Sequence, residues 1–332
     1  TVIAMRSYVP SFGWPFRRAG ASTEEPDTPD TWDKDDNSPL DCEFTPMASD
    51  AIPTSRILYP DPSPAAVAAL EELKTQLAQT DLDSSAPFKE FVLNNDMELH
   101  RFLRARQLDV PKALQMLTEH AAWFDGMRPD LIRAADVEPE ARTGKGRVPG
   151  VDMHGRGMLL LDSSVENTWD ATENMRLLCF NLTRAISINE PGVEKIVVFI
   201  HLYNFGLRTC PSMKVSLETT RMVLHHFPER LGHCILYRPP RVFGGFFRAI
   251  LPFVDPVTRD KIRVINGSGD DGSENDLLLR QIIGPDWKKR TGVDQPAQPG
   301  CSPGYDHEEY WPKVEEWDTQ QQEKLREMES AN

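Results

Sequence analysis

A basic segment stands out in an otherwise acidic chain. The 332 residues carry a formal net charge of −14, yet residues 221–263 contain eight basic and three acidic side chains, a local charge of +5. The basic residues are Arg221, Arg230, Arg238, Arg241, Arg248, Arg259, Lys261 and Arg263, and the acidic ones are Glu229, Asp255 and Asp260. Binding to nucleic acid needs clustered basic side chains, so the overall charge argues against a nucleic-acid partner. The local segment predicts a specific anionic ligand, with a solvated basic face as the alternative.

Motifs of the common enzyme classes are missing from the sequence or poorly placed. Residues 267–272 have the GxGxxG spacing, but Asp270 and Asp271 would put negative charge where a pyrophosphate binds, so we interpret this segment as a surface loop. The sequence has no GxxxxGK[ST], GxSxG or HExxH motif. The adjacent His225 and His226 would point about 100° apart on a helix, so no metal site is predicted.

The five cysteines are scattered and have no CxxC spacing. Cys179 and Cys234 lie within apolar runs and are expected to be small core residues. Neither a disulfide framework nor a zinc site is indicated, which favours a reducing compartment and a cytoplasmic location.

A short segment, 241–251, carries five large apolar side chains: Phe243, Phe246, Phe247, Ile250 and Leu251. It also contains Gly244-Gly245 and is followed by Pro252, which are poor choices for a rigid core helix. The segment is therefore either an ordinary core helix or a movable lid.

The periodicity of apolar residues predicts two kinds of architecture along the chain. Helical stripes fill the first third, beginning at Ser63, a plausible N-cap before Pro64. Beyond a glycine-rich break at 144–157, short apolar runs predict buried strands and longer patterns predict helices. The strands are expected at 158–161, 196–200, 234–237 and 262–265, and the helices at 171–188, 211–227, 241–251, 274–283 and about 312–328. This alternation is typical of an α/β fold with a mostly parallel sheet.

These patterns suggest four parts. Residues 1–60 are expected to be a disordered acidic segment, because residues 21–50 hold ten acids against one lysine. A helical unit at 61–143 precedes an α/β domain at 144–294, and a tail at 295–332 ends in a helix. No stretch approaches the roughly 20 apolar residues that a transmembrane helix needs.

Three separated motifs resemble the CRAL-TRIO family of lipid-binding and transfer proteins. They are RFLRARQLDV at 101–110, PERLG at 228–232 and FVDPVTRDKI at 253–262, and the resemblance covers about residues 60–290. The branch that they resemble most is the phosphatidylinositol/phosphatidylcholine transfer proteins. The resemblance implies a small N-terminal helical unit and a sheet that floors an apolar lipid pocket, closed by a gate helix at 241–251.

The resemblance also implies a headgroup site, whose positions fall on Arg106, Glu229, Thr258 and Lys261. Arg and Lys supply charge-assisted hydrogen bonds to phosphate, Thr a neutral donor, and Glu accepts inositol hydroxyls or orients a cation. A structural ion-pair cluster is the alternative. Two hydroxyl positions associated with phosphatidylcholine align with Ile196 and Val198, which favours the inositol lipid.

One departure from the family pattern suggests a different ligand. The run His201-Leu202-Tyr203-Asn204 stands where relatives read Asp-Leu-x-Gly, and a haem-binding fungal branch uses a His-x-Tyr pair in this region. Residues two apart on a strand share a face, so His201 and Tyr203 are alternative haem ligands. A core histidine with satisfied hydrogen bonds is the competing interpretation.

The function that follows is exchange or presentation of one phospholipid, most simply phosphatidylinositol, without catalysis. Burial of roughly 30 acyl methylenes at ~0.8 kcal/mol each contributes on the order of 25 kcal/mol relative to water, so release is expected only at a membrane. The expected partners are the phospholipid and a membrane surface, with the chain a monomer, peripheral on membranes, and without a metal or resident cofactor. A signalling scaffold with an empty pocket is a further alternative.

Overall fold

The computed structural model describes residues 63–331 except 81, 83, 204, 207, 208, 210 and 211, and excepting the side chains of 86 and 328–331. All described residues belong to one compact unit, Lys34–Asn332. The predicted acidic segment 1–60 lies outside the described residues, and the four domain boundaries remain a prediction.

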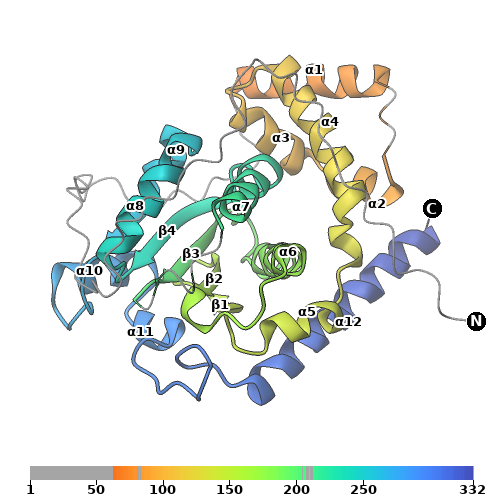
Figure 1. Cartoon of the computed structure of the whole chain (residues 1–332). Helices are drawn as coiled ribbons and strands as arrows, with labels where there is room; N and C mark the ends of the chain where they lie inside the picture. Colours follow the sequence, from red (N-terminus) through yellow and green to blue (C-terminus); the bar gives the residue numbers. More distant parts are fainter. Residues whose placement is uncertain are drawn as a thin grey trace, which may run out of the picture. The chain divides into compact units, whose positions relative to one another are not determined.

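The N-terminal part is helical, as the stripes predict (Figure 1). It comprises α1 (Pro64–Gln79), α2 (Ala86–Phe88), the π-helical turn η2 (Lys89–Leu93), α3 (Asp96–Ala105), α4 (Val110–Met127), the 3-10 turn η3 (Pro129–Leu131) and α5 (Ala134–Ala141). The Ser63 hydroxyl accepts the Ala66 N–H at 3.2 Å, which confirms the N-cap of α1. Apolar faces of α1, α3 and α4 form a shared core that includes Leu73, Phe102 and Leu117.

A five-stranded sheet forms the centre of the second part. Its strands are β1 (Gly146–Val151), β2 (Gly157–Asp162), β3 (Ile196–His201), β4 (Leu231–Tyr237) and β5 (Ile262–Ile265), in the order β1-β2-β3-β4-β5. All neighbouring pairs are parallel except β1 with β2. The mostly parallel α/β fold is confirmed. No strand was predicted within the glycine-rich break at 144–157, which contains the edge strand β1.

Helices cover both faces of this sheet. They are the 3-10 turn η4 (Ser163–Val165), α6 (Ala171–Ser187), α7 (Met213–His226), α8 (Arg241–Ile250), the 3-10 turn η5 (Leu251–Phe253), α9 (Pro256–Arg259), α10 (Glu274–Ile282), α11 (Trp287–Thr291) and α12 (His307–Ala331). Side chains of α10 and α11 pack on one face, where Trp287 is fully buried against Phe199 and Ile235. Side chains of α6, α7 and α8 pack on the other face.

The C-terminal helix α12 runs back along α5 (Figure 1). Trp311 and Val314 bury themselves against α5 and α6, and Asp318 accepts the Ala134 N–H at 3.1 Å. The predicted loop at 267–272 separates β5 from α10, as expected.

Candidate functional site

The predicted gate helix is α8, and its aromatic side chains are not equivalent. Phe243 and Phe247 are buried, with their rings stacked at a centroid distance of 5.6 Å. Phe205, which follows β3, packs edge-on against Phe243 at 5.1 Å. The remaining predicted gate residues, Phe246, Ile250 and Leu251, are partly exposed. A small aromatic cluster therefore holds the inner side of α8 against the sheet.

The sheet face beneath α7 and α8 is less tightly packed than the opposite face. On the central strand β3, Val197 and Phe199 are 0% exposed and contact the α10–α11 side. Val198 and Ile200, which point to the other face, stay partly exposed. Protein interiors are close-packed, so side chains in the middle of a sheet reach solvent only where an opening lies above them. Two apolar side chains of the central strand therefore keep partial exposure on the face that α7 and α8 cover.

Glu229 occupies a strained turn between α7 and β4. Its φ is +60°, a left-handed conformation that costs a non-glycine residue on the order of 1–3 kcal/mol and tends to persist at functional sites. Its carboxylate accepts a hydrogen bond from Lys195 Nζ at 2.6 Å. At Gly232, an added Cβ would lie 3.1 Å from the Ile196 carbonyl oxygen. The PERLG motif thus forms a tight entry into β4 alongside β3.

The Glu229 carboxylate lies among three cations. Burial raises its pKa, but Lys195, Lys261 and Arg104 act in the opposite direction and hold that pKa below its ordinary value. Lys195, Glu229 and Lys261 stand at or just before the first residues of β3, β4 and β5. Because these strands are parallel, the three side chains meet at one edge of the sheet.

Thr258 also reaches this edge. Its hydroxyl and its backbone N–H bond the Asp255 carboxylate, the latter at 2.9 Å, and its carbonyl accepts the Lys261 N–H at 3.1 Å. The structure therefore brings three of the four predicted headgroup residues together: Glu229, Thr258 and Lys261.

Arg106, the fourth, lies nearer to α7. It caps the C-terminus of α3, and its Nη1 donates to the Ala105 carbonyl at 3.1 Å. Burial lowers the pKa of His225 on α7, and the charge of Arg106 lowers it further. Arg104, two residues earlier, is the arginine of this motif that acts on Glu229.

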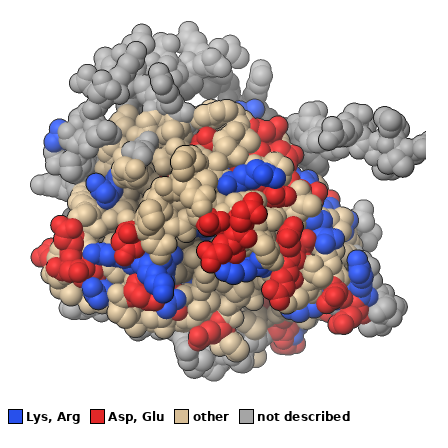
Figure 2. Space-filling model, turned by 90° about the horizontal axis from the view of Figure 1, so that it is seen from below, with Lys and Arg blue, Asp and Glu red and all other residues tan. Residues whose placement is uncertain are grey.

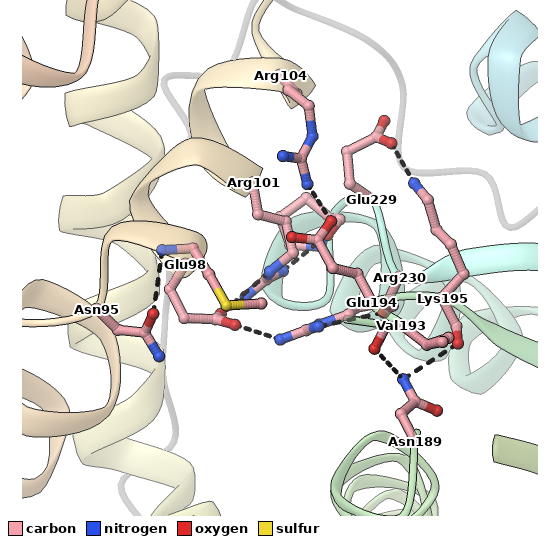
Figure 3. Close-up of polar contacts among 12 residues, drawn as sticks. Asn95, Glu98, Arg101, Arg104, Asn189, Val193, Glu194, Lys195, Glu229 and Arg230 are labelled. Atoms are coloured by element: carbon pink, nitrogen blue, oxygen red, sulfur yellow. Dashed lines mark hydrogen bonds and ion pairs between the residues drawn. The ribbon is translucent and has the colours of Figure 1, made fainter. Parts of the chain in front are cut away.

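An ion-pair network joins α3 to the strand entries (Figure 3). Glu98 binds both Arg101 and Arg230, while Arg101 Nη1 donates to the Pro228 carbonyl at 2.7 Å. Burial raises the pKa of Glu98, but the two arginines lower it to about 2. This part of the network is a buried ion-pair cluster that contains none of the four predicted headgroup residues.

Arg104 differs from the other members of this network. It pairs with Glu194, which precedes β3. Nevertheless, Arg104 Nε and Nη1 and Glu194 Oε1 are buried without a hydrogen-bond partner among the described residues. Buried charged groups are normally fully hydrogen-bonded, so these atoms have bonding capacity left for a ligand. Arg104, Glu194 and Lys195 were not among the predicted site residues, although Arg104 lies within the motif at 101–110.

His201 and Tyr203 do not share a strand face, so the premise of the haem hypothesis is wrong. Strand β3 ends at His201, and Tyr203 follows in a turn, 42% exposed, with Arg238 stacked over its ring. His201 is buried on the α11 side, where its Nε2 lies 3.3 Å from the Thr291 carbonyl oxygen. It has the environment of a core histidine, away from the face covered by α8.

A separate cavity of about 310 Å³ lies between α4, α6, α7 and α12. Aromatic residues including Trp123, Phe180 and Trp317 line it, and none of the predicted site residues does. His226 is buried beside it and stacks on Trp123, whereas His225 is exposed. Within the described ranges, no group of three or more metal-ligating side chains occurs, and no helix is both long and apolar enough to cross a membrane.

The comparisons with known proteins agree with this architecture. The CRAL/TRIO domain model matches residues 141–286, and the CRAL/TRIO N-terminal domain model matches residues 69–119. The two matched ranges together cover more than half of the chain, in the order that the motifs require. The chain belongs to the CRAL-TRIO family.

Its relatives include named lipid transfer proteins. Phosphatidylinositol transfer protein PDR17 of Saccharomyces cerevisiae is 25% identical over 266 residues, which cover 74% of this chain and 71% of that protein. Phosphatidylinositol transfer protein CSR1 of Eremothecium gossypii is 27% identical over 230 residues, covering 63% and 52%. A CRAL-TRIO domain-containing protein of Schizosaccharomyces pombe is 29% identical over 216 residues, or 65% of this chain but only 20% of that protein.

The crystal structure of Sfh5 shows the same fold. It superposes with a TM-score of 0.52 and 16% sequence identity, over 67% of this chain and 84% of that one. This likeness supports the arrangement of the helices and the sheet, and it carries no information about the ligand.

Proposed function

We propose that the protein binds one phospholipid, phosphatidylinositol, between α8 and the sheet and exchanges or presents it at membranes. In this proposal the protein is a cytoplasmic monomer that associates peripherally with membranes. It catalyses no reaction and has no resident cofactor. Membership of the family indicates lipid binding and transfer, and the proposal adds the lipid and its binding site.

The observation that carries this proposal is the accessibility of apolar side chains in the middle of the sheet. Val198 and Ile200 on β3 keep partial exposure beneath α7 and α8, while their neighbours Val197 and Phe199 have none. Apolar surface at the centre of a domain is stabilised when an apolar ligand covers it, by about 25 cal/mol per Å². The absence of hydroxyls at Ile196 and Val198 favours acyl chains over a polar group at this floor.

The preference for an inositol headgroup rests on the charged edge of the sheet. Lys261 and Arg104 supply cations, and Arg104 has two buried donors without a partner among the residues that the structure describes. Glu229 offers acceptor oxygens that suit ring hydroxyls. We therefore add Arg104 to the predicted set of Arg106, Glu229, Thr258 and Lys261.

Mass spectrometry of lipid extracted from the purified protein tests the ligand directly. We expect one phosphatidylinositol per chain. A purified protein that holds no lipid and takes none from vesicles would support the empty scaffold instead. Recovery of another lipid class would reject the assignment of an inositol headgroup but would still support a lipid-binding pocket.

A variant pair tests the headgroup site. Lys261→Ala should slow phosphatidylinositol transfer between vesicles by about tenfold, since a charge-assisted hydrogen bond contributes about 1.5–3 kcal/mol. Transfer of a lipid without a phosphoinositol group should be unaffected. Lys313→Ala, at an exposed position on α12, is the matched control. Equal losses for all lipids would contradict a headgroup role for Lys261.

A further inference from the structure

The hook that follows the gate helix carries the most exposed apolar side chains near the proposed lipid site. It comprises η5 and α9, residues 251–259. Phe253 is 50% exposed and Val257 is 59% exposed, whereas Phe243 and Phe247 of α8 are buried. In the closed protein, therefore, most of the aromatic surface of α8 cannot touch a membrane, but the hook can.

The backbone of the hook is held in an ordered conformation that exposes Phe253 and Val257 to solvent. Pro252 lies in the first turn of η5 and Pro256 in that of α9, which restricts the backbone on both sides. The Val254 N–H donates to the Leu251 carbonyl at 3.0 Å, and the Asp255 carboxylate caps α9. Val254 itself is buried and anchors the hook. The exposure of Phe253 and Val257 is therefore a property of an ordered turn.

Two arginines beside the hook have no carboxylate partner among the described residues. Arg248 Nε donates to the Gly244 carbonyl at 3.2 Å, and Arg259 Nε to the Val254 carbonyl at 2.8 Å. On the face that Figure 2 shows, basic and acidic side chains are intermingled. Residues 241–263 carry five basic and two acidic side chains in a chain of net charge −14. An acidic protein is repelled by an anionic membrane unless such a local excess faces it.

We infer that the hook is the primary membrane contact, with Phe253 and Val257 entering an anionic bilayer surface while Arg248 and Arg259 bind lipid phosphates. This inference rests on the proposed function and separates it into two steps. The hook docks the closed protein, and only then does α8 move. The predicted gate residues then act in the second step and do not provide the first contact.

Vesicle co-sedimentation of the full chain tests the docking step without requiring lipid exchange. Wild-type protein should bind vesicles of phosphatidylcholine with phosphatidylserine more tightly than vesicles of phosphatidylcholine alone. Phe253→Ser combined with Val257→Ser should weaken binding by at least about tenfold, given that each side chain is half exposed before insertion. Leu277→Ser on α10, which replaces an equally exposed residue (52%) at a distance from the hook, is the control.

A second variant isolates the electrostatic part. Arg248→Gln with Arg259→Gln should weaken binding to the anionic vesicles by roughly 30-fold, about fivefold for each arginine, and should have little effect on neutral vesicles. Raising the salt concentration should reduce the difference between wild type and variant. Arg142→Gln with Lys313→Gln, two exposed positions outside residues 241–263, makes a matched change of charge.

The outcomes distinguish this inference from the proposed function. Vesicle binding that the Phe253 and Val257 changes leave intact, or wild-type protein that binds no vesicle, would overturn the docking role of the hook. Vesicle binding without any lipid exchange would instead reject the proposed function and leave the docking surface in place. Thermal unfolding that matches wild type confirms that each variant is folded.

Discussion

Replacing Lys195 by methionine should change the lipid preference of the protein. Lys195 Nζ lies 2.6 Å from Glu229 Oε2, with the two side chains only 14% and 23% exposed. Lys195 occupies one acceptor site of the Glu229 carboxylate and so competes with the hydroxyls of an inositol ring for this carboxylate. A hydrogen bond to a charged group contributes about 1.5–3 kcal/mol, so removing the competitor should raise the affinity for phosphatidylinositol by roughly tenfold or more.

The same change should lower stability. Removing one partner of a fully buried ion pair costs about 3–5 kcal/mol. Glu229 is not fully buried, and in the variant its carboxylate would still be stabilised by the positive charges of Lys261 and Arg104. We therefore expect a loss of about 1–2 kcal/mol, which corresponds to a fall in Tm of a few degrees.

Competition between labelled phosphatidylinositol and phosphatidylcholine for the purified protein, together with thermal unfolding, measures both effects. Lys145→Met is the matched control, because Lys145 is a buried lysine paired with Glu140 and Glu166. It precedes β1, which is antiparallel to β2, so it lies at the opposite edge of the sheet from Lys195. This change should destabilise the protein without changing lipid preference. If Lys195→Met leaves the preference unchanged, or shifts it toward phosphatidylcholine, the reasoning that Glu229 accepts the inositol hydroxyls is wrong.

Three further predictions concern the gate, pH and haem. In hydrogen exchange, the amides of α8 should exchange faster than those of β4, and the difference should increase when vesicles are present. Equal protection of α8 and β4, with and without vesicles, would show that α8 is an ordinary core helix and not a gate. Burial lowers the pKa of His226 and of His233 to about 3, so both stay neutral in the folded protein. Unfolded histidines bind protons below about pH 6.5, whereas these two remain neutral in the folded protein. As the pH is lowered from 6 to 4, the free energy of unfolding measured in urea should therefore fall by about 1.4 kcal/mol per pH unit for each histidine. A free energy that does not change with pH in this range would contradict their burial. Protein grown with iron and a haem precursor should show no Soret band; a band abolished by Tyr203→Phe would restore the haem hypothesis.

The parallel strands could be predicted from the sequence because each is a short apolar run that helices cover on both faces. The predicted run at 262–265 has the bounds of β5, and that at 196–200 differs from β3 by one residue. Strand β1 carries no such signal. Gly146, Pro149 and Gly150 interrupt its pattern, and it pairs only with β2, through an irregular register.

The site was only partly predictable, for a different reason. The motifs located Glu229, Thr258 and Lys261, which the fold brings together at the entries of β4 and β5. Lys195 lies in no motif, and its role depends on its position at the entry of the neighbouring parallel strand. The position before each predicted strand was a usable signal, because parallel strands place those positions at one edge.

The premise of the haem hypothesis depended on where a strand ends. The expectation that His201 and Tyr203 share a face holds only while the strand continues, and the chain leaves β3 after His201. Strand ends are set by tertiary contacts, such as the Leu202 N–H that donates to the Tyr237 carbonyl at 3.0 Å. A shared face would need the strand to continue two residues beyond His201, but Tyr203 already lies in a turn.

The burial of α8 explains why docking and opening need different residues. Moving α8 away from the sheet in water would expose Phe243 and Phe247, whose burial stabilises the closed form by about 1.5–3 kcal/mol each. The open form in water is then populated at roughly 1% or less. A bilayer removes this cost only if it is already in contact with the protein when α8 moves. Phe253 and Val257 are exposed beforehand and sit directly after α8 in the chain, so the contact that they make brings the bilayer to the gate before the gate has to open.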